Sequence, residues 1–232
     1  GSQYRRVRFS LLVGAESQCR FAMPPATLRR FGTRTNRQKR KRERIEASDP
    51  TDRHELARAF RTLIEHAEEF WHRMAPVHRI LRTDEHPSYP GAVLACTVGQ
   101  VTHLRYSSKL PRTPSNPLFA VNYLAREIRK DLAEHHRESV CFARSAAASC
   151  ARMWIYLMDH NYYKRYRIAP PSEMTHAEVA GVDARELRRR RRMWLTRRAF
   201  MSRTPLDHTQ RKVWMGMLAT PERENRINRR VT

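Results

Sequence analysis

Acidic residues, paired cysteines and long apolar runs are all scarce in this sequence, and each scarcity narrows the possible functions. The four cysteines form no CxxC pair and no zinc-like spacing with histidine; they are Cys19, Cys96, Cys141 and Cys150. Such a pattern is typical of reduced, mostly buried thiols in a cytosolic protein. No apolar run approaches the roughly 20 residues of a membrane-spanning helix, and the N-terminus lacks the apolar core of a signal peptide.

The shortage of acids leaves a large positive charge. Lys and Arg number 46 against 23 Asp and Glu, which gives a formal net charge of +23 over 232 residues. This imbalance favours a polyanionic partner. With no membrane segment in view, we expect that partner to be nucleic acid rather than lipid.

Two segments concentrate this charge. Residues 28–44 contain nine basic residues without apolar periodicity, which predicts a solvated loop that a polyanion would order. Residues 184–200 contain eight arginines together with Leu187, Trp194, Leu195 and Phe200, which predicts a basic helix with an aromatic edge. The alternative for both segments is a cationic stretch that only confers solubility. The expected nucleic-acid-binding residues are Arg29, Arg30, Arg34, Arg37, Lys39, Arg40, Lys41, Arg42, Lys164, Arg165, Arg188, Arg189, Arg190, Arg191 and Arg192.

The cluster NYYKRYRI at 161–168 interleaves tyrosines with Lys164, Arg165 and Arg167. It suits a grip on a DNA backbone, and it equally suits a helix end whose tyrosines pack on the core.

Hydrophobic patterning predicts an α/β fold. A hairpin is expected from 4–13 and QCRFAM, with one strand near the sheet centre, and strands from 77–81 and 101–107. A helix should begin near Asp52, with Glu55 completing a capping box, and carry an apolar stripe through Leu56, Phe60, Leu63, Ile64, Ala67, Phe70 and Trp71. Further helices are expected after Tyr89, from Phe119 to about 137, and over 145–159. This order indicates a mixed sheet flanked by helices.

The stretch RTDEHPSYP at 82–90 places acids in a strongly basic chain. Asp84 follows the strand 77–81, which we expect to be central in the sheet, and chemistry in open α/β sheets collects at the carboxyl ends of strands. A carboxylate there is a suitable ligand for Mg²⁺ or Mn²⁺ in phosphodiester chemistry. The alternative is a polar loop in which Asp84 caps the next helix. His86 and His103 are further candidates, although a structural role is expected for both.

Several of these residues together resemble a known family. TDEHPSYP, NPLFAVNYLAREIRKDL, HHRESVCFARS and IYLMDHNYYKRYRI, in that order, resemble the catalytic core of bacterial insertion-sequence transposases of the DDE class, close to the insertion sequence one group. The resemblance implies a ribonuclease H-like core over 3–168, with a basic loop at 28–50 and a basic, mostly helical extension over 169–232. It also implies metal-dependent DNA cleavage and strand transfer, a homo-oligomer on transposon ends or target DNA, and a cytoplasmic, nucleoid-associated location.

Residue by residue, the resemblance gives an incomplete acidic triad. Asp84 matches the second acid and would be a metal ligand. The first acid belongs to a strand ahead of YRRVRFSLLV, and residues 1–13 contain no Asp or Glu, so that acid is either lost or lies before Gly1. Asn122 stands at the third position, with Glu127 the nearest carboxylate in the same helix.

Two other functions remain open at this point. The first is a non-catalytic nucleic-acid-binding protein derived from a transposase, within a larger nucleoprotein assembly. The second and less favoured is a basic structural protein whose two charged segments follow RNA.

Overall fold

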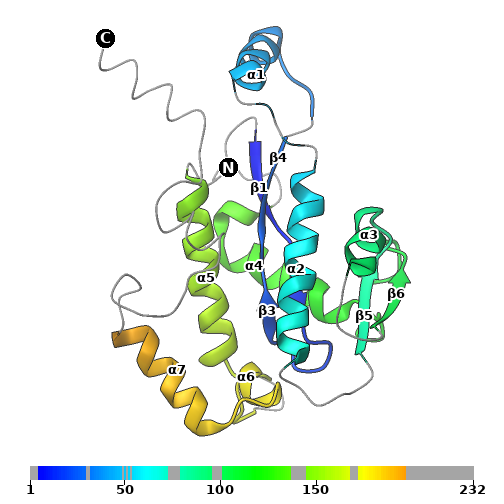
Figure 1. Ribbon diagram of the computed structural model, residues 1–232. Helices are drawn as coiled ribbons and strands as arrows, with labels where there is room; N and C mark the ends of the chain where they lie inside the picture. Colours follow the sequence, from blue (N-terminus) through cyan, green and yellow to red (C-terminus); the bar gives the residue numbers. More distant parts are fainter. Residues whose placement is uncertain are drawn as a thin grey trace.

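The computed structural model describes residues 5–29, 32–48, 50, 52, 54–72, 79–95, 101–136, 145–167 and 172–196. A long bent hairpin runs through the middle of the molecule (Figure 1). Its first arm consists of β1 (Arg5–Phe9) and β2 (Leu12–Val13), and its second of β3 (Arg20–Ala22) and β4 (Pro25–Arg29). β1 pairs with β4 and β2 with β3, both antiparallel. The expected hairpin is therefore present, and its second arm is interrupted at Met23 and Pro24.

The helices and the remaining strands surround this hairpin. α1 (Asn36–Ser48) stands at one end, and α2 (Glu55–His72) crosses one face (Figure 1). A parallel pair, β5 (Arg79–Asp84) and β6 (Val101–Tyr106), lies to one side with α3 (Ser88–Leu94). The chain continues with α4 (Phe119–Asp131), a 3₁₀ turn at Ala133–His135, α5 (Ala146–Tyr162), α6 (His176–Val179) and α7 (Ala184–Thr196).

The fold is a mixed α/β structure, as expected, but the described strands form three two-stranded sheets rather than one continuous sheet. β5 was expected to be central, yet within the described residues it pairs with β6 alone.

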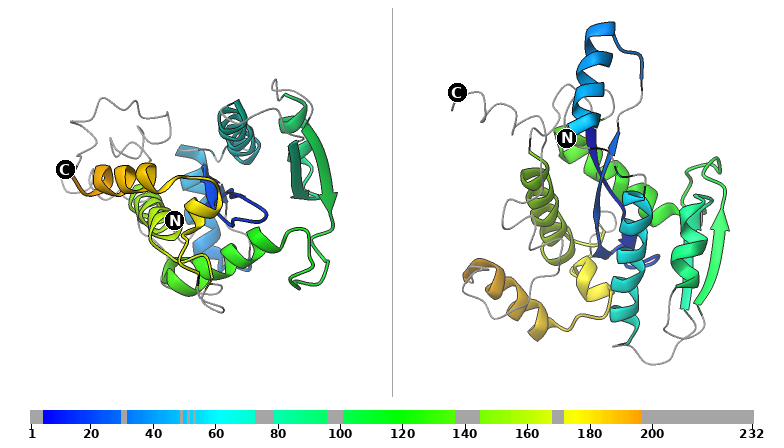
Figure 2. Two further views of the ribbon diagram at one scale, coloured as in Figure 1. Left: turned by 90° about the horizontal axis from the view of Figure 1, so that it is seen from below. Right: turned by 45° about the horizontal axis from the view of Figure 1, so that its top comes forward.

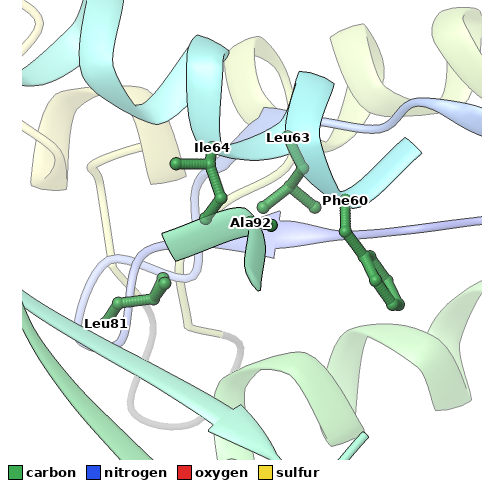
Figure 3. Packing of buried hydrophobic residues seen from close by; sticks show 5 residues of the cluster. All are labelled: Phe60, Leu63, Ile64, Leu81 and Ala92. Carbon is green, nitrogen blue, oxygen red and sulfur yellow. The ribbon is translucent and has the colours of Figure 1, made fainter. Parts of the chain in front are cut away.

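Alternation along the hairpin builds a core on each face. Phe9, Leu11 and Val13 point toward α4 and α5, where they pack around Leu124 and Met153. The intervening Leu12 points the other way, into a cluster that joins α2, α3 and β5 through Phe60, Leu63, Ile64, Leu81 and Ala92 (Figure 3). The period of two places successive side chains on opposite faces. The stripe predicted for the helix after Asp52 is thus core as far as Ala67; the side chains of Phe70 and Trp71 lie outside the described residues.

The turn of the hairpin is held by buried polar side chains from far along the chain. Asn161 accepts a hydrogen bond from the amide of Arg20 at 2.9 Å and donates one to its carbonyl at 2.8 Å. His160 Nε2 and His176 Nδ1 contact the carbonyl oxygens of Gln18 and Ser17 at 3.1 and 2.9 Å. These bonds fix the turn against α5 and α6. Within this turn Gln18 has a φ of 53°, which lies in the left-handed region that non-glycine residues rarely adopt.

Two expectations about local structure are corrected, namely the loop over 28–44 and the capping box of the helix after Asp52. The predicted loop over 28–44 is wrong in the described part, because β4 and α1 occupy most of it. α1 begins with a capping box in which Thr35 Oγ1 accepts from the Gln38 amide at 3.4 Å and Gln38 Oε1 from the Thr35 amide at 3.0 Å. The capping box proposed for α2 does not form, because Glu55 instead accepts from the amide of Thr27 in β4 at 2.8 Å.

The buried histidines make stability depend on pH. Burial, together with the charge of Arg20 and the ring of His176 stacked at 3.9 Å between centroids, lowers the pKa of His160 to about 2. The unfolded chain takes up this proton below its ordinary pKa, about 6.5, whereas the folded chain does not. The contribution to stability is therefore complete above pH 6.5 and is lost as the pH falls.

We expect the free energy of unfolding of the wild type to drop by about 2 kcal/mol between pH 8 and pH 5 on account of His160 alone. His160→Gln keeps a donor for the Gln18 carbonyl but does not titrate, so its unfolding free energy should fall by that much less over the same range. Urea denaturation at the two pH values measures this, with exposed His54→Gln as control. An equal drop in wild type and His160→Gln would contradict the assignment.

Candidate functional site

A cavity of about 470 Å³ lies between the hairpin and the β5–β6 sheet. One border is β2 with the turn after it, and the opposite border is β5. The walls come from α2 and α4, which lie on opposite sides of the space between the two sheets (Figures 1 and 2). Both Asp84 and Asn122 line this cavity. Of the three residues expected at the metal site, the structure thus brings two to one place.

Asp84 is the last residue of β5 and is half-buried. Its Oδ1 accepts a hydrogen bond from the amide of His86 at 3.2 Å. The bond stabilises the turn into α3, but Asp84 does not cap that helix, whose N-cap position is Pro87 with no side-chain cap. The capping alternative for Asp84 is therefore wrong in detail, and Asp84 borders the cavity while its side chain holds the turn.

Glu127 lies apart from these two residues. Its carboxylate forms an ion pair with Lys164, just beyond α5, and both side chains are largely buried. Glu127 is absent from the cavity lining. It follows that the structure does not support Glu127 as a substitute for the third acid, because its charge is already neutralised at another place.

The cavity contains one acid and two arginines. Among its lining residues Asp84 is the sole carboxylate, accompanied by Arg82 and Arg112. Burial and the nearby charge of Asp84 raise the pKa of Tyr89, another lining residue, to about 12, so its hydroxyl stays protonated. Within the described ranges, no three His, Cys, Asp or Glu side chains gather closely enough to hold a metal ion. One carboxylate and one amide do not fit a pair of metal ions, which calls for about three acids.

The two histidines near Asp84 have structural contacts. His86 Nδ1 accepts from the Ser88 amide at 3.3 Å, and its ring lies edge-on to Phe60 at 5.3 Å. His103 Nε2 lies 2.8 Å from Thr83 Oγ1, and burial together with Arg105 lowers the pKa of His103. Both contacts agree with the structural roles expected for these residues.

α1 carries an exposed basic stripe, which sequence reasoning missed when it assigned this region to a loop. The stripe consists of Arg37, Arg40, Lys41 and Arg44, all exposed. Their spacing of i, i+3, i+4 and i+7 places them on one face of the helix, over about 10 Å of its axis. α1 lies beyond the end of the hairpin formed by β1 and β4 (Figure 1). Lys39 lies on a different face, Arg34 precedes the helix, and Arg42 is half-buried. The side chains of Arg29 and Arg30 lie outside the described residues.

α7 is the basic helix that the sequence predicts, but several of its arginines make contacts within the chain. Arg189 and Arg190 bind Glu186, with N–O distances of 2.6 and 2.7 Å. Arg190 Nη1 also donates to the Tyr162 hydroxyl, and Arg191 Nε to the Tyr162 carbonyl, each at 2.7 Å. Arg190 and Arg191 thus fasten α7 to the end of α5, whereas Arg188, Arg189 and Arg192 are exposed.

The NYYKRYRI cluster likewise contains both side chains that make contacts within the chain and side chains that are exposed. Tyr162 is buried with Leu187, and the Tyr166 hydroxyl donates to the Glu16 carbonyl at 2.7 Å. Lys164 is paired with Glu127, whereas Arg165 has an exposed side chain and joins the bridge to Thr175 through its backbone. Packing on the core therefore accounts for these two tyrosines.

Comparison with protein-family models, with curated proteins and with solved structures finds no match for this chain. No described helix combines the length and apolarity that crossing a bilayer requires.

Glu127→Ala tests the structural role of Glu127. The substitution leaves the largely buried ammonium of Lys164 unpaired, so we expect the free energy of unfolding in urea to fall by about 1–3 kcal/mol, while DNA binding is unchanged. Glu43→Ala, at an exposed position on α1, is the control and should change stability by less than about 0.5 kcal/mol. A Glu127→Ala protein as stable as the wild type would show that the pair with Lys164 carries no net stabilisation.

Proposed function

We propose that this chain is a DNA-binding protein of the DDE-transposase type, which holds duplex DNA through the exposed stripe of α1. The single observation that carries the proposal is the placement of four cations on one face of a projecting helix. An α-helix fits the major groove, and arginines along it pair with phosphates on either side. The net charge of +23 adds a general attraction for a polyanion.

The ribonuclease H-like core remains part of this proposal. Support comes from the order of elements, a hairpin followed by a helix, a strand, a short helix, a parallel strand and a helix. Further support is the shared cavity of Asp84 and Asn122, the residues that the resemblance matches to the second and third acids. Cleavage and strand transfer with Mg²⁺ or Mn²⁺ would then require carboxylates beyond Asp84. Homo-oligomer formation and binding to transposon ends belong to the same proposal.

A non-catalytic nucleic-acid-binding protein is the second candidate. Two observations favour it: the cavity offers one carboxylate beside two arginines, and Glu127 is neutralised by Lys164. The two candidates share DNA binding and differ only in chemistry at Asp84.

Removing the stripe should weaken DNA binding more than an equal loss of charge elsewhere. We expect a variant with Arg37, Arg40, Lys41 and Arg44 all changed to Gln to lose much of its affinity for duplex DNA. The slope of log K against log salt should fall by about 3 to 4, because up to four phosphate contacts are lost. Fluorescence anisotropy over a salt series measures both.

The matched control carries the same change at four exposed basic positions outside α1: Arg61, Lys109, Arg126 and Lys130. Its net charge is identical to that of the stripe variant, and we expect a clearly smaller loss. Equal losses in the two variants would mean that DNA binding depends on total charge and not on α1. A stronger preference of the wild type for structured RNA at equal salt would favour an RNA partner instead.

Nicking of supercoiled plasmid in Mn²⁺ separates the two candidates. Because Asp84 is the sole carboxylate lining the cavity, we expect this chain to nick no faster than Asp84→Ala or than the wild type with EDTA, while both proteins bind DNA equally. Nicking by the wild type that is lost in Asp84→Ala would contradict this and show that further carboxylates complete the centre.

A further inference from the structure

Two aromatic side chains differ from the others because they are exposed. Among the Phe, Tyr and Trp residues whose burial the structure describes, Tyr163 and Trp194 are the two most exposed, at 43% and 48%. The neighbouring tyrosines of the NYYKRYRI cluster are used within the chain, since Tyr162 is buried with Leu187 and Tyr166 bonds the hairpin turn. Tyr163 and Trp194 are therefore open to a ligand.

The two exposed rings share one cationic neighbour. The guanidinium carbon of Arg191 lies 5.0 Å from the centre of the Tyr163 ring, and Arg191 Nε donates to the Tyr162 carbonyl at 2.7 Å. Trp194 follows Arg191 by three positions on α7, which makes the two side chains neighbours on the helix surface. The end of α5 and one face of α7 thus meet in an aromatic patch, which consists of Tyr163, Arg191 and Trp194.

Positive charge borders the aromatic patch. Two exposed arginines follow Tyr163 along the chain and two others adjoin Arg191 on α7, namely Arg165, Arg167, Arg188 and Arg192. α7 itself holds six arginines against one acid, Glu186, and that carboxylate already binds Arg189 and Arg190. A ligand for this patch must therefore carry negative charge as well as flat apolar faces.

Unpaired nucleotides combine these two properties. In a duplex the faces of the bases are stacked on one another, whereas in a single strand they can stack on aromatic side chains. Proteins that hold single strands combine such rings with cations that follow the phosphates, and guanidinium groups add cation–π contacts. An acidic peptide would pair with the arginines but would leave the two rings without a matching partner.

We propose that the aromatic patch binds single-stranded DNA, with unpaired bases stacked on Tyr163 and Trp194 and phosphates paired with the arginines around them. This surface is separate from the duplex-binding stripe of α1. α1 lies beyond the β1–β4 end of the hairpin, whereas α7 is fastened to the end of α5 near the hairpin turn (Figure 1). The choice of DNA over RNA rests on the proposed function, and the patch itself does not.

The test compares two fluorescein-labelled single strands, each about 12 nucleotides long, on the full chain. One is oligothymidine, and the other is an abasic strand with the same phosphates and no bases. Fluorescence anisotropy should show that the wild type binds oligothymidine at least about fivefold more tightly, because the abasic strand has nothing to stack.

Trp194→Leu and Tyr163→Leu remove one ring each and keep an apolar side chain. Each should weaken oligothymidine binding at least about fivefold and leave binding of the abasic strand unchanged. The salt dependence of oligothymidine binding should also stay unchanged, because no cation is removed. Leu94→Ala, at an 85% exposed position on α3, is the control and should bind both strands like the wild type.

The variant with Gln at all four positions of the α1 stripe separates this proposal from the proposed function. It should lose duplex affinity and keep most of its affinity for oligothymidine, whereas the two ring variants should bind duplex DNA like the wild type. Circular dichroism verifies that every variant is folded.

Four results would overturn the proposal. One is equal binding of oligothymidine and the abasic strand by the wild type. Another is an equal loss of affinity for both strands in the ring variants, which would mean that the rings position α7 and do not contact bases. The third is tighter binding of oligouridine than of oligothymidine, which would assign the patch to RNA. The fourth is loss of oligothymidine binding in the α1 variant, which would place both ligands on one surface.

Discussion

The fold depends on how the turn of the central hairpin is held. Residues 16–20 expose backbone groups that would be costly to bury without partners, and the partners come from about 140 to 160 positions later in the chain. Asn161 satisfies both the amide and the carbonyl of Arg20, while His160, Tyr166 and His176 meet the carbonyls of Gln18, Glu16 and Ser17. These contacts tie the first strands to α5 and α6. Residues 172–196, expected to be an extension, are thereby packed against the core.

The same region shows that positive charge in this chain has two uses. Arg20 is 2% exposed, its guanidinium lies 4.6 Å from the centre of the Tyr156 ring, and burial lowers its pKa to about 10. Arg190 and Arg191 bind Tyr162 and hold α7 in place. The net charge therefore overstates the surface offered to a polyanion. The stripe on α1 is different, because its four side chains are exposed.

Much of the fold could be predicted from the sequence, and the failures have physical causes. The apolar stripe of α2 is buried as far as Ala67, and the hairpin forms, so both predictions are confirmed in the described residues. α1 was missed because it lacks the apolar periodicity that predicts a packed helix; the residue that it buries is Ile45. Its signal was local: TNRQ is a capping box, and arginine, lysine, glutamine and glutamate are good helix formers. Glu55 was misassigned because a tertiary bond to β4 competes with the local cap.

The site was predictable only in part, for a related reason. Position along the chain places Asp84 at a strand end, but it cannot show that Glu127 is neutralised by a lysine from beyond another helix. A cavity is still harder to predict, since it depends on where several elements fail to meet. The elements that form the walls are expected from the sequence, yet none of the patterns reveals that residues of β2 and β5 line the same cavity.

Asp84 has two roles in the structure. As the end of β5 it borders the cavity, and through its bond with the His86 amide it directs the chain into α3. Arg82 and Arg112 line the same cavity. A pair of metal ions calls for about three acids, so one carboxylate beside two guanidinium groups limits the metal chemistry that this lining can support.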